Sequence, residues 1–147
     1  MNQSKGHNSL STKMLLTGAV GFYEAASALL KNDDMFHWPA FFVNLSYSFE
    51  LSLKSMLVYR EVVTYNDLKK IGHDLSKSLS MAISFGYKLP DPNISDLISI
   101  LSPLHMRNEL RYMRGGVVEI PDAEQARQLA WLHIQAIGDQ IPINDLP

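Results

Sequence analysis

The sequence predicts an all-α protein, an up-and-down helical bundle of four long helices plus a short one. Apolar residues recur every three or four positions in four long stretches, which is the spacing of one face of a helix. No stretch alternates convincingly between apolar and polar residues, as a half-buried strand would. We expect one domain over residues 11–140, with flexible tails at residues 1–10 and 141–147.

Composition restricts the classes of function. A chain of 147 residues can bury the core of one domain, and its 46% hydrophobic and 19% charged residues are typical of globular proteins. The formal net charge of −2 excludes a globally basic nucleic-acid binder, so any phosphate site must be a local patch. The absence of cysteine excludes disulfides and thiolate metal sites. With no apolar run of the length of a signal or membrane span, we expect a cytoplasmic protein without membrane contact.

The first two helices are expected over residues 11–31 and from Pro39 to about Arg60. Asn32-Asp33-Asp34 separates them as a turn. The first apolar stripe consists of Leu15, Leu16, Ala19, Phe22, Tyr23, Ala26, Leu29 and Leu30. The second consists of Phe42, Leu45, Phe49, Leu53, Met56 and Leu57. Both stripes follow helical periodicity.

Two kinds of residue alternate within the second helix. Phe49 and Leu53 lie on its apolar stripe, so we expect both to be buried. Glu50 and Lys54 stand four residues apart, a spacing at which opposite charges stabilise a helix. We expect that pair to be exposed.

A short helical turn and a third long helix are predicted next. Thr64 and Asp67 have the spacing of a capping box. After a turn at residues 71–75, a helix should run to about Gly86, with Asp74 favourable at its positive N-terminal end. Its apolar face consists of Leu75, Leu79, Ala82 and Ile83.

Two more long helices complete the predicted bundle. Residues 87–93 contain two prolines and read as a loop, and residues 94–113 read as one amphipathic helix ended by two glycines. Asp122 and Gln125 cap a final helix that ends near Gly138. Its apolar face consists of Ala126, Leu129, Ala130, His133, Ala136 and Ile137.

The segment over residues 104–116 concentrates basic and polar side chains. At about 100° per residue, Arg107, Arg111 and Arg114 fall along one flank of the expected helix. Guanidinium groups match phosphate oxygens in geometry and charge, so this flank is a candidate site for binding RNA or nucleotide phosphates. The alternative is a solvated helix face.

The remaining polar residues of this segment point elsewhere. His105 and Tyr112 fall on the opposite flank. Asn108 falls in line with the apolar positions, where a buried amide needs hydrogen-bond partners. The apolar positions in line with it are Leu97, Leu101 and Leu104.

The five histidines show no metal-ligand spacing. No two of them stand three or four residues apart, so the sequence predicts neither a metal site nor a cofactor. His133 lies on an apolar helix face, which favours a hydrogen-bonded core histidine. For His73, which precedes a helix, a structural role in the turn is favoured as much as any other role. The five are His7, His37, His73, His105 and His133.

Three segments together resemble the HEPN family (higher eukaryotes and prokaryotes nucleotide-binding). They are residues 49–57, which read Phe-Glu-Leu-Ser-Leu-Lys-Ser-Met-Leu, residues 72–75, which read Gly-His-Asp-Leu, and Arg107-Asn108. Their order and spacing match the family over most of the chain. In HEPN proteins a Glu-x-x-Leu-Lys helix precedes a His-Asp-Leu turn, and an arginine, often followed by Asn, comes later.

The resemblance implies a fold, partners and an activity. HEPN proteins are all-α bundles that usually dimerise, and many are metal-independent ribonucleases, including toxins of toxin–antitoxin pairs. Their arginine and histidine meet in the cleft between two protomers. For this chain the resemblance implies a homodimer, RNA or a nucleotide as ligand, and a cognate antitoxin or other protein partner. It implies a catalytic place for Arg107 and Asn108 and supporting roles for Glu50 and His73.

The chain departs from the family at the catalytic histidine. In the family, about four to six residues separate the arginine from the catalytic histidine. Counted from Arg107, the matching positions hold Tyr112, Met113 and Arg114. Tyrosine is a poor general base at neutral pH because its ordinary pKa is about 10. His105 could replace the histidine only in a rearranged cleft. Arg127 and His133 have a suitable spacing, although such a spacing arises readily by chance.

Three functions follow from these residues. The first is a HEPN-like RNA- or nucleotide-phosphate-binding protein with a degenerate nuclease motif. The second is an active metal-independent endoribonuclease of a toxin–antitoxin or defence system, which uses Arg107 with His105 or Tyr112. The third is a non-catalytic structural or partner-binding module in which the arginines pair with acidic residues.

Overall fold

Helices and their connections make up every residue that the computed structural model describes, namely 2–31, 37–112 and 120–142. The all-α prediction is therefore confirmed, and no strand occurs in those ranges. The helices are α1 (Asn2–Leu30), α2 (Trp38–Tyr59), α3 (Tyr65–Ile71), α4 (Leu75–Ser84), α5 (Asn93–Met106), α6 (Glu109–Tyr112) and α7 (Ala123–Gln140). Of these helices, none has the length and apolar character needed to cross a membrane.

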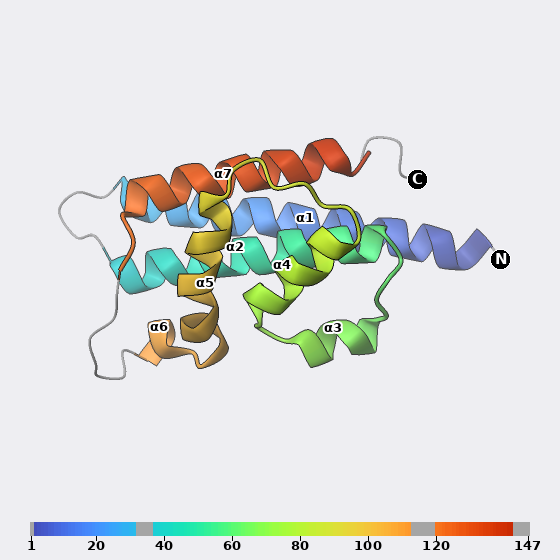
Figure 1. The fold of residues 1–147 in the computed structure, drawn as a ribbon, viewed down its shortest axis with the longest axis horizontal. Coiled ribbons are helices and arrows are strands. Elements are labelled where there is room, and N and C mark those ends of the chain that lie inside the picture. The colour runs from blue at the N-terminus through green and yellow to red at the C-terminus, as the bar shows by residue number, and fades with distance from the viewer. Residues whose placement is uncertain (1, 32–36, 113–119, 143–147) are drawn as a thin grey trace.

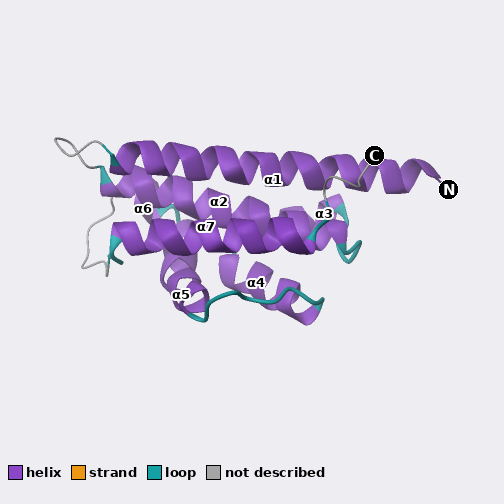
Figure 2. Ribbon diagram, turned by 90° about the horizontal axis from the view of Figure 1, so that it is seen from above, coloured by secondary structure: helices purple, strands orange, loops and turns teal. Residues whose placement is uncertain are grey.

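The three longest helices lie side by side, and α4 and α5 pack on one side of them. Figure 1 shows α1 antiparallel to α2, with α7 running in the same direction as α2. Helix α5 lies across the long axis of these three, and Figure 2 shows it nearly end-on, with α4 beside it. The up-and-down arrangement of four long helices that we expected is thus not observed, because α5 crosses the bundle. Helix α1 also begins at Asn2, earlier than the predicted start at Ser11.

Helix α2 is the centre of the core. Phe49 and Leu53 are fully buried, as its apolar stripe predicts. Small residues let α1 approach it closely: the Ser48 hydroxyl donates a hydrogen bond to the Ala19 carbonyl oxygen at 2.8 Å. A Cβ atom added at Gly18 would lie 3.0 Å from Leu51 Cδ1, so a larger residue there would require the Leu51 side chain to shift by a few tenths of an ångström.

The helix starts predicted from capping residues are confirmed. The Thr64 hydroxyl accepts a hydrogen bond from the Asp67 amide, and the Asp67 carboxylate accepts one from the Thr64 amide, which is a capping box for α3. The Asp74 carboxylate caps α4 by accepting from the Lys77 amide, and the Asp122 carboxylate caps α7 by accepting from the Gln125 amide. Each cap satisfies amide groups that have no partner within the helix.

The helix predicted over residues 94–113 is interrupted, contrary to expectation. Helix α5 ends at Met106 and α6 begins at Glu109. Between them, Asn108 has a φ of 56°, a left-handed conformation that asparagine tolerates better than most residues. Its amide donates to the His105 carbonyl oxygen at 3.3 Å. Asn108 therefore turns the chain and does not continue the apolar stripe.

His133 is a buried core histidine, as its position on the apolar face of α7 predicts. Its Nε2 lies 2.7 Å from the Ser52 hydroxyl oxygen and its Nδ1 lies 2.6 Å from the Tyr87 hydroxyl oxygen. The Ser52 hydroxyl donates to the Ser48 carbonyl oxygen at 2.8 Å, so it accepts from His133 Nε2–H. Tyr87 therefore donates its proton to Nδ1. Burial lowers the pKa of His133 to about 3 and raises the pKa of Tyr87, so both stay neutral.

Truncation of Leu53 to alanine should destabilise the fold by about 2–5 kcal/mol, because the side chain is fully buried on α2. Leu132→Ala is the matched control: Leu132 is exposed on α7, and its loss should cost less than about 0.5 kcal/mol. Urea unfolding followed by circular dichroism measures both. Equal losses would show that α2 does not present this face to the core.

Acid should destabilise the protein in a pH window that His133 creates. The unfolded chain binds a proton at this histidine below pH about 6.5, whereas the folded chain, with a pKa of about 3, does not. The free energy of unfolding should therefore fall as pH decreases from about 6.5, by up to about 1.4 kcal/mol per pH unit. Urea melts between pH about 7 and about 4.5 should show this slope in the wild type and a reduced slope in His133→Gln. His37→Gln, at an exposed position, should leave the slope unchanged.

Candidate functional site

A carboxylate sits on the buried face of α2. Glu50 is 5% exposed and lies between the core residues Phe49 and Leu53 in the sequence. A charge in such a place is costly unless it is paired and hydrogen-bonded. Glu50 has three such partners: His73, His105 and Lys54.

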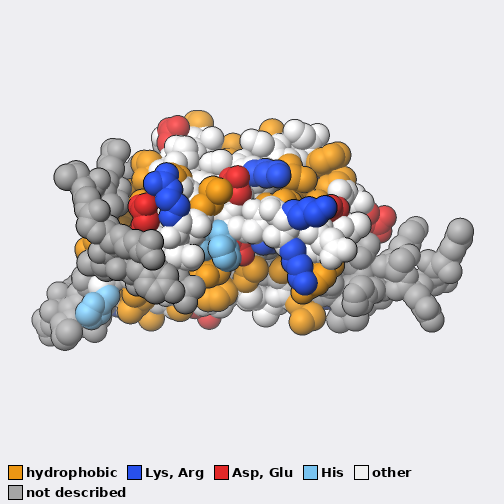
Figure 3. All heavy atoms as spheres, turned by 90° about the horizontal axis from the view of Figure 1, so that it is seen from below, with side chains coloured by type: hydrophobic (Ala, Val, Ile, Leu, Met, Phe, Trp, Pro, Cys, Tyr) orange, Lys and Arg blue, Asp and Glu red, His pale blue; other side chains and the backbone are white. Residues whose placement is uncertain are grey.

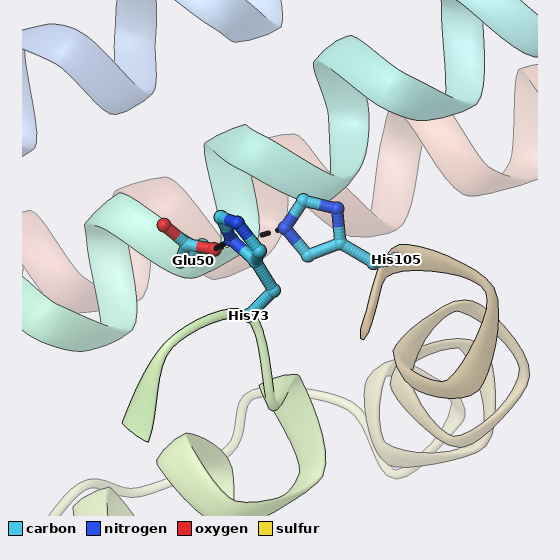
Figure 4. A group of neighbouring side chains, drawn as sticks. All are labelled: Glu50, His73 and His105. Atoms are coloured by element: carbon cyan, nitrogen blue, oxygen red, sulfur yellow. Dashed lines mark hydrogen bonds and ion pairs between the residues drawn. The ribbon is translucent and has the colours of Figure 1, made fainter. Parts of the chain in front are cut away.

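The two histidines reach Glu50 from separate elements (Figure 4). His73 lies in the turn between α3 and α4, after Gly72, whose φ of 57° favours glycine, and before Asp74, which caps α4. His105 lies in the last turn of α5. The turn and the end of α5 therefore converge on the middle of α2.

Both histidines bond to the same oxygen of Glu50. His73 Nδ1 lies 2.6 Å and His105 Nε2 lies 2.9 Å from Oε1, whereas Lys54 Nζ lies 3.4 Å from Oε2. An ionised carboxylate only accepts, so each imidazole donates an N–H. Burial opposes ionisation of Glu50, but the hydrogen bonds from His105 and His73 and the charge of Lys54 outweigh it and hold the pKa of Glu50 below its ordinary value.

Aromatic packing fixes the orientation of both imidazoles. The Tyr47 ring meets the His105 ring edge to face at a centroid distance of 4.8 Å and the His73 ring at 5.8 Å. The two imidazole centroids are 4.8 Å apart. Tyr47 is itself stacked on Phe22 of α1, at 5.2 Å. The site is therefore held by packing on α1 and α2 as well as by hydrogen bonds.

One edge of this cluster is accessible. The side chain of His73 is 41% exposed, whereas those of Glu50 and His105 are 7% and 4% exposed. Because His73 donates through Nδ1, its Nε2 carries the lone pair of the neutral ring. Such an imidazole, oriented by a carboxylate on one nitrogen and basic on the other, is the arrangement that catalytic histidines use.

The cluster also has the composition of a metal-ligand set. One ligand atom each from Glu50, His73 and His105 lies within 4.8 Å of the others. Two imidazole nitrogens and one carboxylate oxygen form a donor set that zinc uses in proteins. Sequence spacing could not reveal it, because His73 and His105 stand 23 and 55 residues from Glu50.

The predicted phosphate-binding residues are described only in part. The Arg107 side chain is 68% exposed at the end of α5, with Nη1 3.3 Å from Glu109 Oε1. The side chains of Arg111 and Tyr112 and the whole of Arg114 lie outside the described residues. The expectation of one arginine flank along a single helix is wrong, because the helix is interrupted between α5 and α6.

One further expectation needs correction. The Glu50–Lys54 pair is not exposed, since the Lys54 side chain is 12% exposed and its partner is buried. His105, which we placed on the flank opposite the arginines, is buried and bonds to Glu50. The signal that we missed is the position of Glu50 on the helix. It precedes the stripe residues Leu53 and Leu57 by three and seven residues, which places it on the same face of α2.

The alternative pair Arg127 and His133 does not form a reactive site. His133 is fully buried and both its ring nitrogens are engaged by Ser52 and Tyr87. Arg127 donates to the Tyr23 hydroxyl oxygen at 2.8 Å and pairs with Glu124. Neither side chain is thus placed to serve the other.

Removal of the Glu50 carboxylate should strongly destabilise the protein. Glu50→Ala leaves two imidazole N–H groups and the Lys54 ammonium without their acceptor, which should cost about 3–5 kcal/mol. Glu50→Gln keeps one acceptor oxygen and should cost less. Glu24→Ala removes an exposed acid of α1 and should leave the urea midpoint nearly unchanged. A Glu50→Ala variant as stable as Glu24→Ala would contradict the buried cluster.

Comparisons with protein-family models, with curated proteins and with solved structures found no match for this chain. The resemblance to HEPN proteins accordingly remains a prediction from the residues quoted above.

Proposed function

We propose that this protein is a HEPN-like RNA-binding protein that cleaves the RNA phosphodiester bond without a metal ion, with His73 as its general base. One observation carries the proposal: a buried carboxylate, Glu50, holds one nitrogen of His73, and the His73 side chain is 41% exposed. Of the functions considered, an endoribonuclease makes the best use of this arrangement. His73 would take the place of the histidine that the family motif has after its arginine.

The chemistry follows from the tautomer of His73. Glu50 Oε1 accepts the Nδ1–H, so Nε2 can take the proton of an RNA 2′-hydroxyl. The 2′-oxygen attacks the adjacent phosphorus, the bond to the 5′-oxygen breaks, and the 5′-oxygen leaves with a proton from solvent or from the imidazolium. The products are a 2′,3′-cyclic phosphate and a 5′-hydroxyl. Glu50 stabilises the imidazolium formed in between.

His105 and Lys54 act as positioning residues in this proposal. His105 Nε2–H and Lys54 Nζ each bond to Glu50, and both favour its charged form. A charged Glu50 is needed to hold His73 Nδ1–H and to offset the positive charge that His73 gains.

Arg107 supplies the contact to the phosphate. It follows His105 by two residues at the end of α5, and its contact with Glu109 is an exposed pair that contributes little to stability. The guanidinium can therefore exchange that carboxylate for a phosphate oxygen. Figure 3 shows basic, acidic and histidine side chains interspersed on the face seen from below, so among the residues drawn in colour no continuous basic field is present there. Affinity should accordingly depend on a few contacts.

A homodimer would complete such a site. One small bundle offers a shallow surface, and an isologous pairing would place the His73 and Arg107 side chains of two copies around one RNA strand. The dimer, like the antitoxin or other partner implied by the resemblance, is part of this proposal.

The proposal predicts cleavage that depends on His73 in the presence of a chelator. Full-length protein treated with EDTA should cleave a labelled single-stranded RNA to a 2′,3′-cyclic phosphate product. His73→Gln should lower the rate by about 100-fold or more, the usual contribution of a general base, without loss of RNA binding. His37→Gln, an exposed histidine before α2, is the matched control and should retain the wild-type rate.

Arg107→Ala separates binding from chemistry. It should weaken RNA binding and reduce the slope of log affinity against log salt by about 1, because one phosphate contact is lost. Wild-type protein that does not cleave RNA, or cleavage at an equal rate in His73→Gln, would refute the proposed reaction.

A further inference from the structure

The geometry points to a second use of the same three side chains: we propose that Glu50, His73 and His105 bind a divalent transition-metal ion, with zinc as the preferred ion. The ligand atoms are Glu50 Oε1, His73 Nδ1 and His105 Nε2. They come from three elements, α2, the turn before α4, and the end of α5, and lie within 4.8 Å of one another.

The hydrogen bonds of the cluster bring both imidazole nitrogens to the same oxygen of Glu50. Nδ1 and Nε2 both face Oε1, at 2.6 and 2.9 Å. In a tetrahedral zinc site with bonds of about 2.1 Å, ligand atoms lie about 3.4 Å apart. The two hydrogen-bonded separations would have to open by about 0.5–0.8 Å for an ion to replace the two shared protons. The two imidazole nitrogens, which lie within 4.8 Å of each other, would have to reach the same spacing. The half-exposed turn that carries His73 can supply this movement.

The donor set selects the kind of ion. Imidazole nitrogen favours zinc and similar first-row ions, whereas magnesium and calcium favour sites made of oxygen. Three protein ligands leave a fourth position of a tetrahedral ion open. The 41% exposed side chain of His73 places the cluster at the edge of the bundle and not deep inside it. The edge-to-face contacts with the Tyr47 ring restrict rotation of both imidazoles.

Lys54 sets the strength of this site. Its ammonium lies 3.4 Å from Oε2, the oxygen that does not bond the histidines, so Glu50 would bind the ion through Oε1 alone. The ammonium also repels a dication only a few ångströms away. Removal of this charge should strengthen metal binding. If Lys54 had only a structural role, its removal would leave metal binding unchanged.

Metal binding has a consequence for His73 that rests on the proposed function. With the ion on Nδ1, the proton of the neutral ring must lie on Nε2, which then has no lone pair for a 2′-hydroxyl proton. Zinc should therefore inhibit the metal-independent cleavage. Metal binding itself does not depend on whether the protein cleaves RNA.

The test is equilibrium zinc binding to the metal-stripped full-length protein, measured by competition with a chromophoric chelator, together with the visible absorption of the cobalt complex. The wild type should bind a single zinc ion, and cobalt should give the intense bands of a four-coordinate site. His73→Gln should weaken zinc binding by at least about tenfold. Lys54→Met should tighten it, and His37→Gln should leave it unchanged.

The outcomes separate this inference from the proposed function. Zinc binding that is absent, or that is equally strong in His73→Gln, overturns the metal site even if EDTA-resistant cleavage is found. Zinc binding that depends on His73 in a protein that cleaves no RNA supports the metal site and refutes the nuclease. Circular dichroism of each variant verifies that a loss of zinc binding does not come from unfolding.

Discussion

The buried charge of Glu50 is the constraint on which the rest of the structure depends. A carboxylate inside a helical bundle must be matched by donors, and here the donors come from α2 itself, from the turn before α4 and from the end of α5. These bonds connect the layer of long helices to the crossing helix α5. The same bonds that position the crossing elements also form the Glu50–His73–His105 cluster, so stability and the proposed chemistry depend on one set of atoms.

Two polar clusters on α2 have opposite environments. Ser52 meets His133 and Tyr87 in a closed, neutral chain of hydrogen bonds, and burial keeps the histidine uncharged. Glu50 meets His73 and His105 in a charged cluster with one edge in solvent. The first cluster can only hold α2 and α7 together, because every polar atom of it is satisfied internally. The second is the cluster to which we assign proton transfer and ion binding, because its His73 side chain is 41% exposed.

Local patterns in the sequence predicted what is local in the structure. The capping residues Thr64, Asp74 and Asp122, the burial of Phe49 and Leu53, and the core position of His133 all follow from spacing along single helices. The Glu50–Lys54 pair was misjudged because its i,i+4 spacing says nothing about His105, which arrives from 55 residues away. The interruption at Asn108 was also missed, since helical periodicity extends across a single left-handed residue without a visible change.

The turn that carries His73 has a consequence for how this chain can vary. Gly72 ends α3 and Asp74 caps α4, so a single residue spans the distance between two helix termini. The identity of that residue can change without disturbing either cap, since its own side chain is half exposed. The length of the turn cannot change in the same way, because one added or deleted residue would change where α4 begins relative to α3 and would move the imidazole away from the carboxylate. In this segment, a substitution therefore changes the chemistry of the side chain at position 73, whereas an insertion or deletion changes the arrangement of the helices.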